Sequence, residues 1–292
     1  MSWVEISFET PQAQAQIWSD KLEALGAASV SFYDAGTTPI LEPLPGETTL
    51  WHQVKVVGLF SQDDFNETII HAIQKQLPHT PIQSAVLAEQ DWTRTWLEYF
   101  KPIQFGEKLW IVPTDASAPE QKDAVIVRLD PGLAFGTGTH PTTALCLGWL
   151  DKNPPLNQTV LDYGCGSGIL AIGALKLGAA HAFAIDYDPQ ALIATQENGL
   201  RNDIKANQLT VCLPENKPAN LKAQTILANI LAQPLISLSS VLTEHCTPGG
   251  NLVMSGLLVN QIDEVGAAYE PFFDIKDVQV QEEWALLYCI KR

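Results

Sequence analysis

The sequence predicts an α/β fold in two parts, a small α+β domain followed by a doubly wound, mainly parallel sheet. Three observations support this prediction. Residues 1–89 carry the pattern β-α-β-β-α-β, which is typical of a ferredoxin-like module. From residue 159 onward, short apolar runs alternate with helical patterns, and the chain ends on a hairpin pattern. A chain of 292 residues is also long for one domain and natural for two.

The composition limits the classes of function. Hydrophobic residues make up 46% of the chain and charged residues 17%, which allows a sizeable core. The formal net charge of −16 would repel phosphates, so we expect no direct binding of nucleic acid. The same charge favours either a basic protein partner or simply solubility. No apolar run reaches the length of a membrane span, and the first residues do not resemble a signal peptide. We therefore expect a cytoplasmic protein without membrane association.

The cysteines point to the same compartment. All five lie far apart in the sequence, their number is odd, and no CxxC pair occurs. This pattern is typical of a reducing compartment, and it predicts neither a disulfide framework nor a metal site.

In the N-terminal domain, residues 1–89, alternating apolar residues predict strands and helical spacing predicts helices. The predicted strands cover residues 3–8, 28–33, 51–60 and 82–89, and the predicted helices cover residues 12–25 and 63–76. We find no set of chemically reactive residues in this domain. A module of this kind beside a catalytic domain is expected to hold the substrate, although a fold alone does not establish a function.

Residues 90–101 are predicted to form a linker helix between the domains. Asp91 is a typical helix N-cap, and Trp92, Trp96 and Tyr99 fall on one face of the helix. Two interpretations remain open: a hinge that sets the orientation of the domains, or an ordinary apolar stripe that packs in a core.

The remaining residues, 102–292, are predicted to form the catalytic domain. Its predicted strands cover residues 109–113, 124–129, 159–161, 182–185, 209–213, 224–228 and 251–255. Its predicted helices cover residues 142–150, 169–177, 188–200, 234–244 and 261–269. A closing hairpin is predicted to pair residues 272–281 with 284–291. A turn is predicted at Pro248-Gly-Gly, before the strand at 251–255.

A loop rich in glycine and threonine, Asp130 to Thr143, precedes the helix at 142–150. Glycines allow a backbone to approach a ligand closely, and threonine hydroxyls can cap a helix or bond a ligand. Phe135 is a candidate for contact with a sulfonium or an adenine ring. His140 is interpreted as stabilising the loop rather than as a base.

Gly164, Gly166 and Gly168 interrupt the chain between a buried strand and a helix. This geometry brings bare backbone N–H groups close to a ligand. Asp186 follows Gly164 by 22 residues, at the end of the next predicted strand. A carboxylate at that offset can accept hydrogen bonds from both hydroxyls of a ribose.

The glycines alone leave the ligand ambiguous. Gly166, Gly168 and Ala171 satisfy G-x-G-x-x-A, the fingerprint of dinucleotide binding. Asp162, however, lies just before the first glycine, where it would repel a pyrophosphate and suit a cationic ligand without phosphate. The pattern favours the binding of such a ligand over the alternative that the turn serves packing alone.

Four stretches together resemble the ribosomal protein L11 methyltransferase family (PrmA), a family of S-adenosylmethionine-dependent methyltransferases. They are Asp91-Trp with Trp96, the loop from Asp130 to Thr143, the run from Asp162 to Gly168, and Ala228-Asn-Ile-Leu-Ala232. The resemblance spans nearly the whole chain, although the glycine run is shared with many methyltransferases.

The resemblance implies a Rossmann-like, seven-stranded methyltransferase sheet with an N-terminal ferredoxin-like domain. It implies S-adenosyl-L-methionine as cofactor, and trimethylation of lysine ε-amines and of the N-terminal α-amine of ribosomal protein L11. The N-terminal domain would bind this substrate and move about the linker. We also expect a monomer.

The resemblance also implies roles for single residues. Four residues match positions that contact the cofactor in this family: Thr143, Gly164, Asp186 and Asn229. The full set of candidate cofactor-binding residues adds Phe135, Asp162 and Gly166. Residues 213–222 depart from the family pattern, because they offer no Asp for the adenine amine.

Asn229 is the candidate catalytic residue. It follows the fourth strand of the sheet, where its side-chain carbonyl can accept an amine N–H and aim the lone pair at the methyl carbon. The alternative is that Asn229 caps the helix that follows. Other interpretations of the whole chain also remain: a methyltransferase for another protein or for a small-molecule amine, a nicotinamide-dependent oxidoreductase, or a cofactor-binding protein without catalysis.

Overall fold

The chain forms two compact units, Met1–Thr95 and Trp96–Arg292. The computed structural model describes residues 2–36, 49–63, 65–87, 101–130 and 140–292. The predicted linker helix and Phe135 lie outside these residues. None of the described helices is both long enough and apolar enough to span a membrane.

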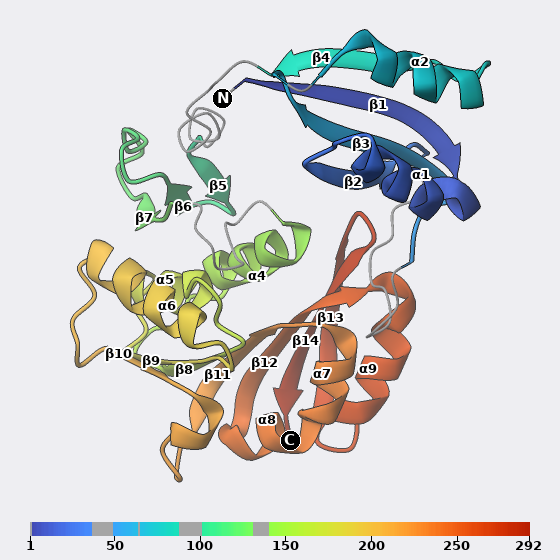
Figure 1. Cartoon of the computed structure of the whole chain (residues 1–292). Coiled ribbons are helices and arrows are strands. Elements are labelled where there is room, and N and C mark those ends of the chain that lie inside the picture. Colours follow the sequence, from blue (N-terminus) through green and yellow to red (C-terminus); the bar gives the residue numbers. More distant parts are fainter. Residues whose placement is uncertain (1, 37–48, 64, 88–100, 131–139) are drawn as a thin grey trace. The chain divides into compact units, whose positions relative to one another are not determined.

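The N-terminal unit is a four-stranded antiparallel sheet with two helices (Figure 1). Its elements are β1 (Trp3–Pro11), α1 (Gln12–Ala24), β2 (Ser29–Asp34), β3 (Gln53–Ser61), α2 (Glu67–Gln76) and β4 (Gln83–Leu87). The strand order is β2-β3-β1-β4, with antiparallel neighbours throughout. The predicted β-α-β-β-α-β order is therefore observed.

Every second residue of the central strands builds the core of this unit. Ile6 and Phe8 of β1 and Phe60 of β3 are buried together with Trp18 of α1. The rings of Phe8 and Trp18 meet edge to face, with centroids 5.0 Å apart. Helix α2 begins later than predicted, because the side chain of Asn66 accepts a hydrogen bond from the backbone of the helix and caps it there.

The C-terminal unit contains the predicted seven-stranded sheet. Its order is β10-β9-β8-β11-β12-β14-β13, and its strands are β8 (Thr159–Tyr163), β9 (His181–Ile185), β10 (Leu209–Cys212), β11 (Ala223–Asn229), β12 (Cys246–Leu258), β13 (Phe273–Gln281) and β14 (Trp284–Lys291). The first five strands run parallel, and β14 inserts antiparallel between β12 and β13. Since the strand order reverses beside β8, its carboxyl end is the position where open α/β sheets bind ligands.

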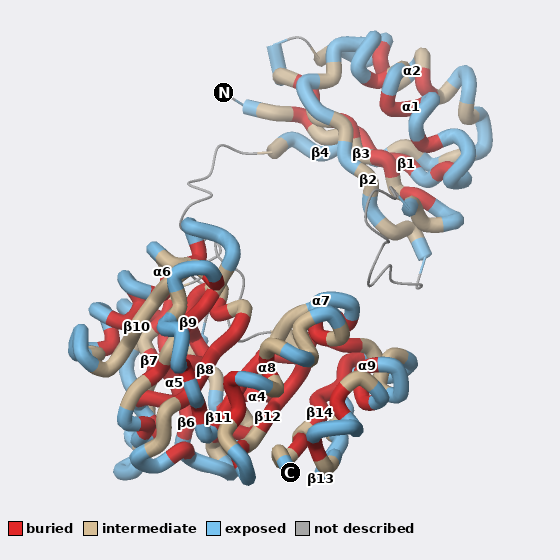
Figure 2. The backbone as a smooth tube through the Cα atoms, turned by 90° about the horizontal axis from the view of Figure 1, so that it is seen from below, coloured by how far each residue is buried: buried red, intermediate tan, exposed pale blue. Residues whose placement is uncertain are grey.

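Helices cover both faces of this sheet. They are α4 (Pro141–Lys152), α5 (Ile169–Lys176), α6 (Pro189–Arg201), α7 (Ala232–Ser237), α8 (Ser239–His245) and α9 (Ile262–Tyr269), with short 3-10 turns at Pro214–Asn216 and Val259–Gln261. Neighbouring strand residues point to opposite faces: Val160 packs with α4 and α5, and Leu161 packs with α7 and α9. Figure 2 shows that buried residues concentrate in the central strands.

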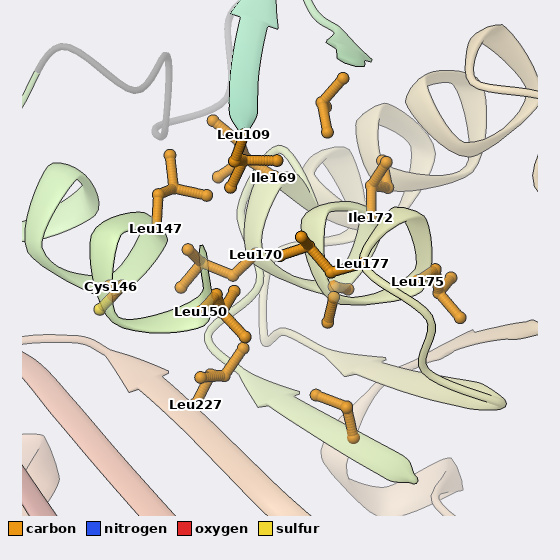
Figure 3. Packing of buried hydrophobic residues seen from close by; sticks show 14 of the residues in the cluster. Leu109, Cys146, Leu147, Leu150, Ile169, Leu170, Ile172, Leu175, Leu177 and Leu227 are labelled. Atoms are coloured by element: carbon orange, nitrogen blue, oxygen red, sulfur yellow. The ribbon is translucent and has the colours of Figure 1, made fainter. Parts of the chain in front are cut away.

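The α4–α5 face is the larger of the two cores. Leu147 and Leu150 of α4 meet Leu170 of α5 above Leu227 of β11 (Figure 3). This packing fixes the first turn of α4 and the first turn of α5 above the same end of the sheet.

A three-stranded sheet precedes α4 and was only partly predicted. Strands β6 (Leu109–Val112) and β7 (Val125–Arg128) match the prediction, but β5 (Ile103–Phe105) was missed. The turn between β5 and β6 is held by Asp151 of α4, whose carboxylate accepts the backbone N–H groups of residues 107–109 at 2.5–3.0 Å.

Two predicted boundaries were wrong. The single helix expected at 234–244 is two helices, α7 and α8, which meet at Leu238. The turn expected at Pro248-Gly-Gly lies within β12, where the pairing with β11 shifts register. A bulged strand accommodates such glycines without leaving the sheet.

Candidate functional site

The turn after β8 is built from glycines in left-handed conformations. Gly164, Gly166 and Gly168 have φ angles of +83°, +53° and +78°. The N–H groups of Gly164 and Cys165 both donate to the carbonyl of Ile185, at 2.7 and 3.1 Å. These bonds tie the turn to the end of β9, where Asp186 follows.

Helix α6 presses against the same turn. A Cβ at Gly168 would lie 2.7 Å from Cγ2 of Thr195, so no larger residue fits there. Thr195 is fully buried, and its hydroxyl donates to the carbonyl of Gly166 at 3.0 Å. The sequence therefore forms a tight turn because both conformation and space demand glycine.

Asp186 joins the glycine turn to the following helix. One carboxylate oxygen accepts the Gly166 N–H at 2.9 Å, and the other accepts the Asp188 N–H at 3.0 Å. Each oxygen keeps a second lone pair for a ligand hydroxyl. Two of the candidate residues, Gly166 and Asp186, are thus joined by a direct hydrogen bond.

Asp162 is the most unusual group in the site. Its side chain is fully buried, Oδ2 accepts the Ala171 N–H at 3.0 Å, and Oδ1 has no partner in the described part of the chain. The pKa of Asp162 is raised to about 7, mainly by burial; the Ala171 hydrogen bond opposes this rise, and the nearby Asp186 adds to it. A buried carboxylate oxygen without a partner fits a site that receives a cationic group.

The thiols near Asp162 add no negative charge. Burial is the largest cause that raises the pKa of both Cys146 and Cys165, and the nearby Asp162 raises both further. Both cysteines therefore stay protonated and neutral at neutral pH, so they place no second negative charge beside Asp162.

Asn229 lies at the end of β11 and is held by α4. Its Nδ2 donates to Oγ1 of Thr143 at 3.2 Å, although the two residues are 86 positions apart in the sequence. Thr143 is fully buried in the first turn of α4. The alternative of a helix cap is wrong, because the N-cap of α7 is Leu231 and that cap has no side-chain hydrogen bond.

His140 caps α4, as expected for a residue that stabilises the loop. Its Nδ1 accepts the Thr142 N–H at 3.4 Å and lies 2.8 Å from the Thr142 hydroxyl. Its ring meets that of Trp284 edge to face at 4.9 Å. The tip of the β13–β14 hairpin therefore packs beside the start of α4, close to Thr143.

Sequence reasoning missed two residues at this end of the sheet. Tyr187, directly after Asp186, exposes 68% of its surface. Ile230, directly after Asn229, packs against the glycine turn, since a Cβ at Gly164 would lie 2.3 Å from its Cγ2. The sequence could have indicated Tyr187, because it is an aromatic residue directly after the Asp at the end of a strand. No sequence pattern indicates the position of Ile230.

The arrangement fits a ligand with a ribose and a cationic group. Asp186 offers acceptors for hydroxyls, the glycines leave room for close approach, and Asp162 disfavours phosphate. The described residues include no group of three or more His, Cys, Asp or Glu side chains that could bind a metal ion.

Comparison with known proteins identifies the family. The model of the family described as ribosomal protein L11 methyltransferase (PrmA) matches residues 2–292. The chain is 46% identical over 296 residues to the ribosomal protein L11 methyltransferase of Aliivibrio salmonicida, with 100% of both chains covered. It is 48% identical over 288 residues to that of Mannheimia succiniciproducens, with 97% of both covered.

A solved structure agrees with these relatives. The ribosomal protein L11 methylase from Lactobacillus delbrueckii subsp. bulgaricus is 34% identical, with a TM-score of 0.60, and the match covers 66% of this chain and 100% of that one. The chain therefore belongs to the family of ribosomal protein L11 methyltransferases.

Proposed function

We propose that the protein transfers methyl groups from S-adenosyl-L-methionine to amino groups of ribosomal protein L11. The targets are lysine ε-amines and the N-terminal α-amine, each carried to the trimethylated state. The family match over residues 2–292 is the observation that carries this proposal. Relatives described as ribosomal protein L11 methyltransferase align over 97–100% of the chain, which supports a role for both units in this activity.

Residues at the carboxyl ends of β8 and β9 would hold the cofactor. Asp186 would accept the ribose hydroxyls, the turn from Gly164 to Gly168 would pass along the ligand, and Asp162 would face its cationic end. When bound, the cofactor supplies a methyl carbon activated by the positive sulfur. Tyr187 would cover the ligand from the solvent side.

The attacking amine has to be neutral, and this is the main chemical demand on the protein. A lysine amine ordinarily titrates near pH 10.4 and an α-amine near 7.7–8.0. Apolar surroundings lower the pKa of an amine without a dedicated base, because burial disfavours its charged form. Leu231 and Val259 expose apolar side chains at this end of the sheet and would supply such surroundings.

Asn229 would orient the amine. Its Nδ2 is engaged with Thr143, and none of the described residues donates to its side-chain oxygen. That oxygen would accept an amine N–H and point the lone pair at the methyl carbon, which reduces the entropy cost of alignment. The hydrogen bond to Thr143 fixes which end of the carboxamide faces the substrate.

The N-terminal unit would recognise the substrate. We assign residues 1–89 to this role and residues 90–101 to the linker. The N-terminal unit carries a cavity of about 470 Å³ whose lining includes Glu9, Lys55 and His79, and this cavity offers both charged and apolar contacts. The net charge of −16 favours a basic protein partner, and we place the enzyme in the cytoplasm as a monomer.

A labelling experiment tests the substrate. The protein is incubated with radiolabelled S-adenosylmethionine and an extract of bacterial large ribosomal subunits. We expect label on L11 alone, and label on no ribosomal protein would reject the proposal. A thermal shift with S-adenosylhomocysteine but none with NAD would separate this function from an oxidoreductase.

Asn229→Ala tests the orienting role, with the exposed Asn207→Ala as matched control. We expect kcat to fall at least a hundredfold in Asn229→Ala while the Kd for the cofactor changes less than threefold. Equal losses in kcat and cofactor binding would show that Asn229 only holds the cofactor.

A further inference from the structure

Strand β12 carries a bulge at Gly256, next to the end of β11. The pairing of β12 with β14 shifts register between Ser255 and Leu257, so Gly256 is the additional residue. Its φ angle is +87°, a left-handed conformation, and the residue is buried. Bulges of this kind re-aim the chain beside them.

The bulge brings two backbones into direct contact. A Cβ at Gly256 would lie 2.4 Å from the carbonyl oxygen of Ile230, 2.7 Å from its carbonyl carbon and 2.9 Å from its nitrogen. The Ile230 N–H donates to the carbonyl of Ser255 at 3.1 Å. The atoms that would clash are backbone atoms, so no change of rotamer can relieve the clash.

A second glycine faces Ile230 from the other side. Strand β11 lies between β8 and β12 in the sheet, and Gly164 follows β8. A Cβ at Gly164 would meet the side chain of Ile230 at 2.3 Å. Ile230 therefore fits between two glycines, one against its side chain and one against its backbone.

We propose that Gly256 is a positioning residue for methyl transfer. The missing side chain lets the backbone of Ile230 lie against β12, and this contact sets where the carboxamide of Asn229 stands relative to the glycine turn. The inference rests on the proposed function, because it assigns Gly256 an effect that is transmitted through Asn229.

The size of the effect follows from the contact distance. Ordinary van der Waals contact of a Cβ begins at 3.4 Å, so the 2.4 Å contact at Gly256 would push the Ile230 backbone by roughly 1 Å. A misplacement of about 1 Å in an active site can cost on the order of a hundredfold in rate. We expect Gly256→Ala to lower kcat ten- to a hundredfold.

Gly249 provides a matched control in the same strand. Its φ angle is +71°, and a Cβ there would meet nothing within 4 Å. Gly249→Ala thus introduces the same kind of backbone strain without the contact with Ile230. Gly256→Ala should lose more thermal stability than Gly249→Ala, because only its Cβ meets the Ile230 backbone. Only Gly256→Ala should lose kcat, with KM for the cofactor changed less than threefold.

Activity is measured on purified L11 with the full-length enzyme. The double variant Gly256→Ala with Asn229→Ala should be no slower than Asn229→Ala alone, because residues that act through one another are not additive. Fully additive losses, or equal kcat values for Gly256→Ala and Gly249→Ala, would overturn the inference.

A second pair of variants covers the case in which Gly256→Ala does not fold. Asparagine tolerates left-handed φ angles better than alanine but still carries a Cβ. Gly256→Asn should therefore lose kcat and Gly249→Asn should not. Equal kcat values in this pair would again overturn the inference.

Crystal structures provide a readout that does not depend on activity. The hydrogen bond of 3.2 Å from Asn229 to Thr143 should be lost in Gly256→Ala and kept in Gly249→Ala. If wild-type enzyme leaves L11 unlabelled, the proposed function fails while the crystal structures still test the contact. If Asn229→Ala keeps full kcat, the orienting role of Asn229 fails, and the inference that Gly256 acts through Asn229 is overturned with it. An unmoved Asn229 in Gly256→Ala would overturn the inference alone.

Discussion

Replacement of Asp162 by asparagine should stabilise the folded protein at pH 8 and weaken its binding of the cofactor. The carboxyl is fully buried and accepts one hydrogen bond, from Ala171, while Oδ1 has no partner among the described residues. Burial is the main cause that raises its pKa to about 7. At pH 8 the folded protein therefore holds a buried charge that asparagine, with nearly the same shape, removes.

The expected gain is a few kcal/mol. A rise of the pKa from 3.8 to about 7 corresponds to roughly 4 kcal/mol of disfavoured ionisation. Asparagine would place an amide N–H₂ at the position of Oδ1, and an unpaired buried donor costs about 1–3 kcal/mol. The net gain is about 2 kcal/mol, or a rise of roughly 4–8 °C in Tm for a unit of this size.

The direction in which stability changes with pH follows from the same rise in the pKa of Asp162. The folded-state pKa of Asp162 lies above its unfolded value, so the folded protein binds the proton more tightly between about pH 4 and pH 7. The contribution of this carboxyl to stability is present at low pH and lost as the pH rises through about 7. The advantage of Asp162→Asn should therefore be largest at pH 8 and shrink towards pH 5.

Thermal denaturation at pH 8, 6.5 and 5 measures the stability difference, and Asp203→Asn, at an exposed position, controls for the loss of one charge. Calorimetric titration with S-adenosylmethionine at pH 8 measures affinity. We expect Asp162→Asn to bind at least tenfold more weakly. A variant less stable than wild type at pH 8, or a gain that does not shrink at pH 5, would refute the burial argument, and unchanged affinity would refute a cationic partner for Asp162.

Three further substitutions test contacts around the site. Asp151→Ala removes the acceptor of three backbone N–H groups and should lower the free energy of unfolding by about 2–3 kcal/mol in urea denaturation; no loss would mean that water replaces these bonds. Asn202→Ala breaks two hydrogen bonds to the backbone of Arg128, at 2.6 and 2.7 Å, and should cost about 2 kcal/mol, with Asn207→Ala neutral as control. Tyr187→Ala should weaken cofactor binding about three- to tenfold without changing Tm, because its side chain is exposed; a large drop in Tm would instead indicate a packing role.

Periodicity predicted most of the fold because the local sequence patterns agree with the elements that the chain forms. Apolar strands, the glycine turn and the closing hairpin all carry strong short-range signals, and the seven-stranded sheet follows from their order. Strand β5 was missed because three residues, Ile103–Phe105, are too few to show a period. The break at Leu238 was missed because no glycine or proline marks it.

The site was predicted less completely for a physical reason. Gly164 and Asp186 lie in a local motif with fixed spacing, so the sequence alone points to them. The partner of Asn229 is Thr143, and this contact exists only after the sheet and α4 have packed. The contact of Gly256 with Ile230 requires a strand bulge, which no pattern in the sequence announces.

The small sheet that precedes α4 determines where the chain can be divided to express the C-terminal unit alone. Phe105, Leu109 and Val127 are buried in the same cluster as the helices over β8 and β11. A fragment that starts after Arg128 would open that cluster to water, and it would aggregate or unfold however intact its cofactor motifs were. Anyone expressing the C-terminal unit alone should therefore begin the clone upstream of Ile103.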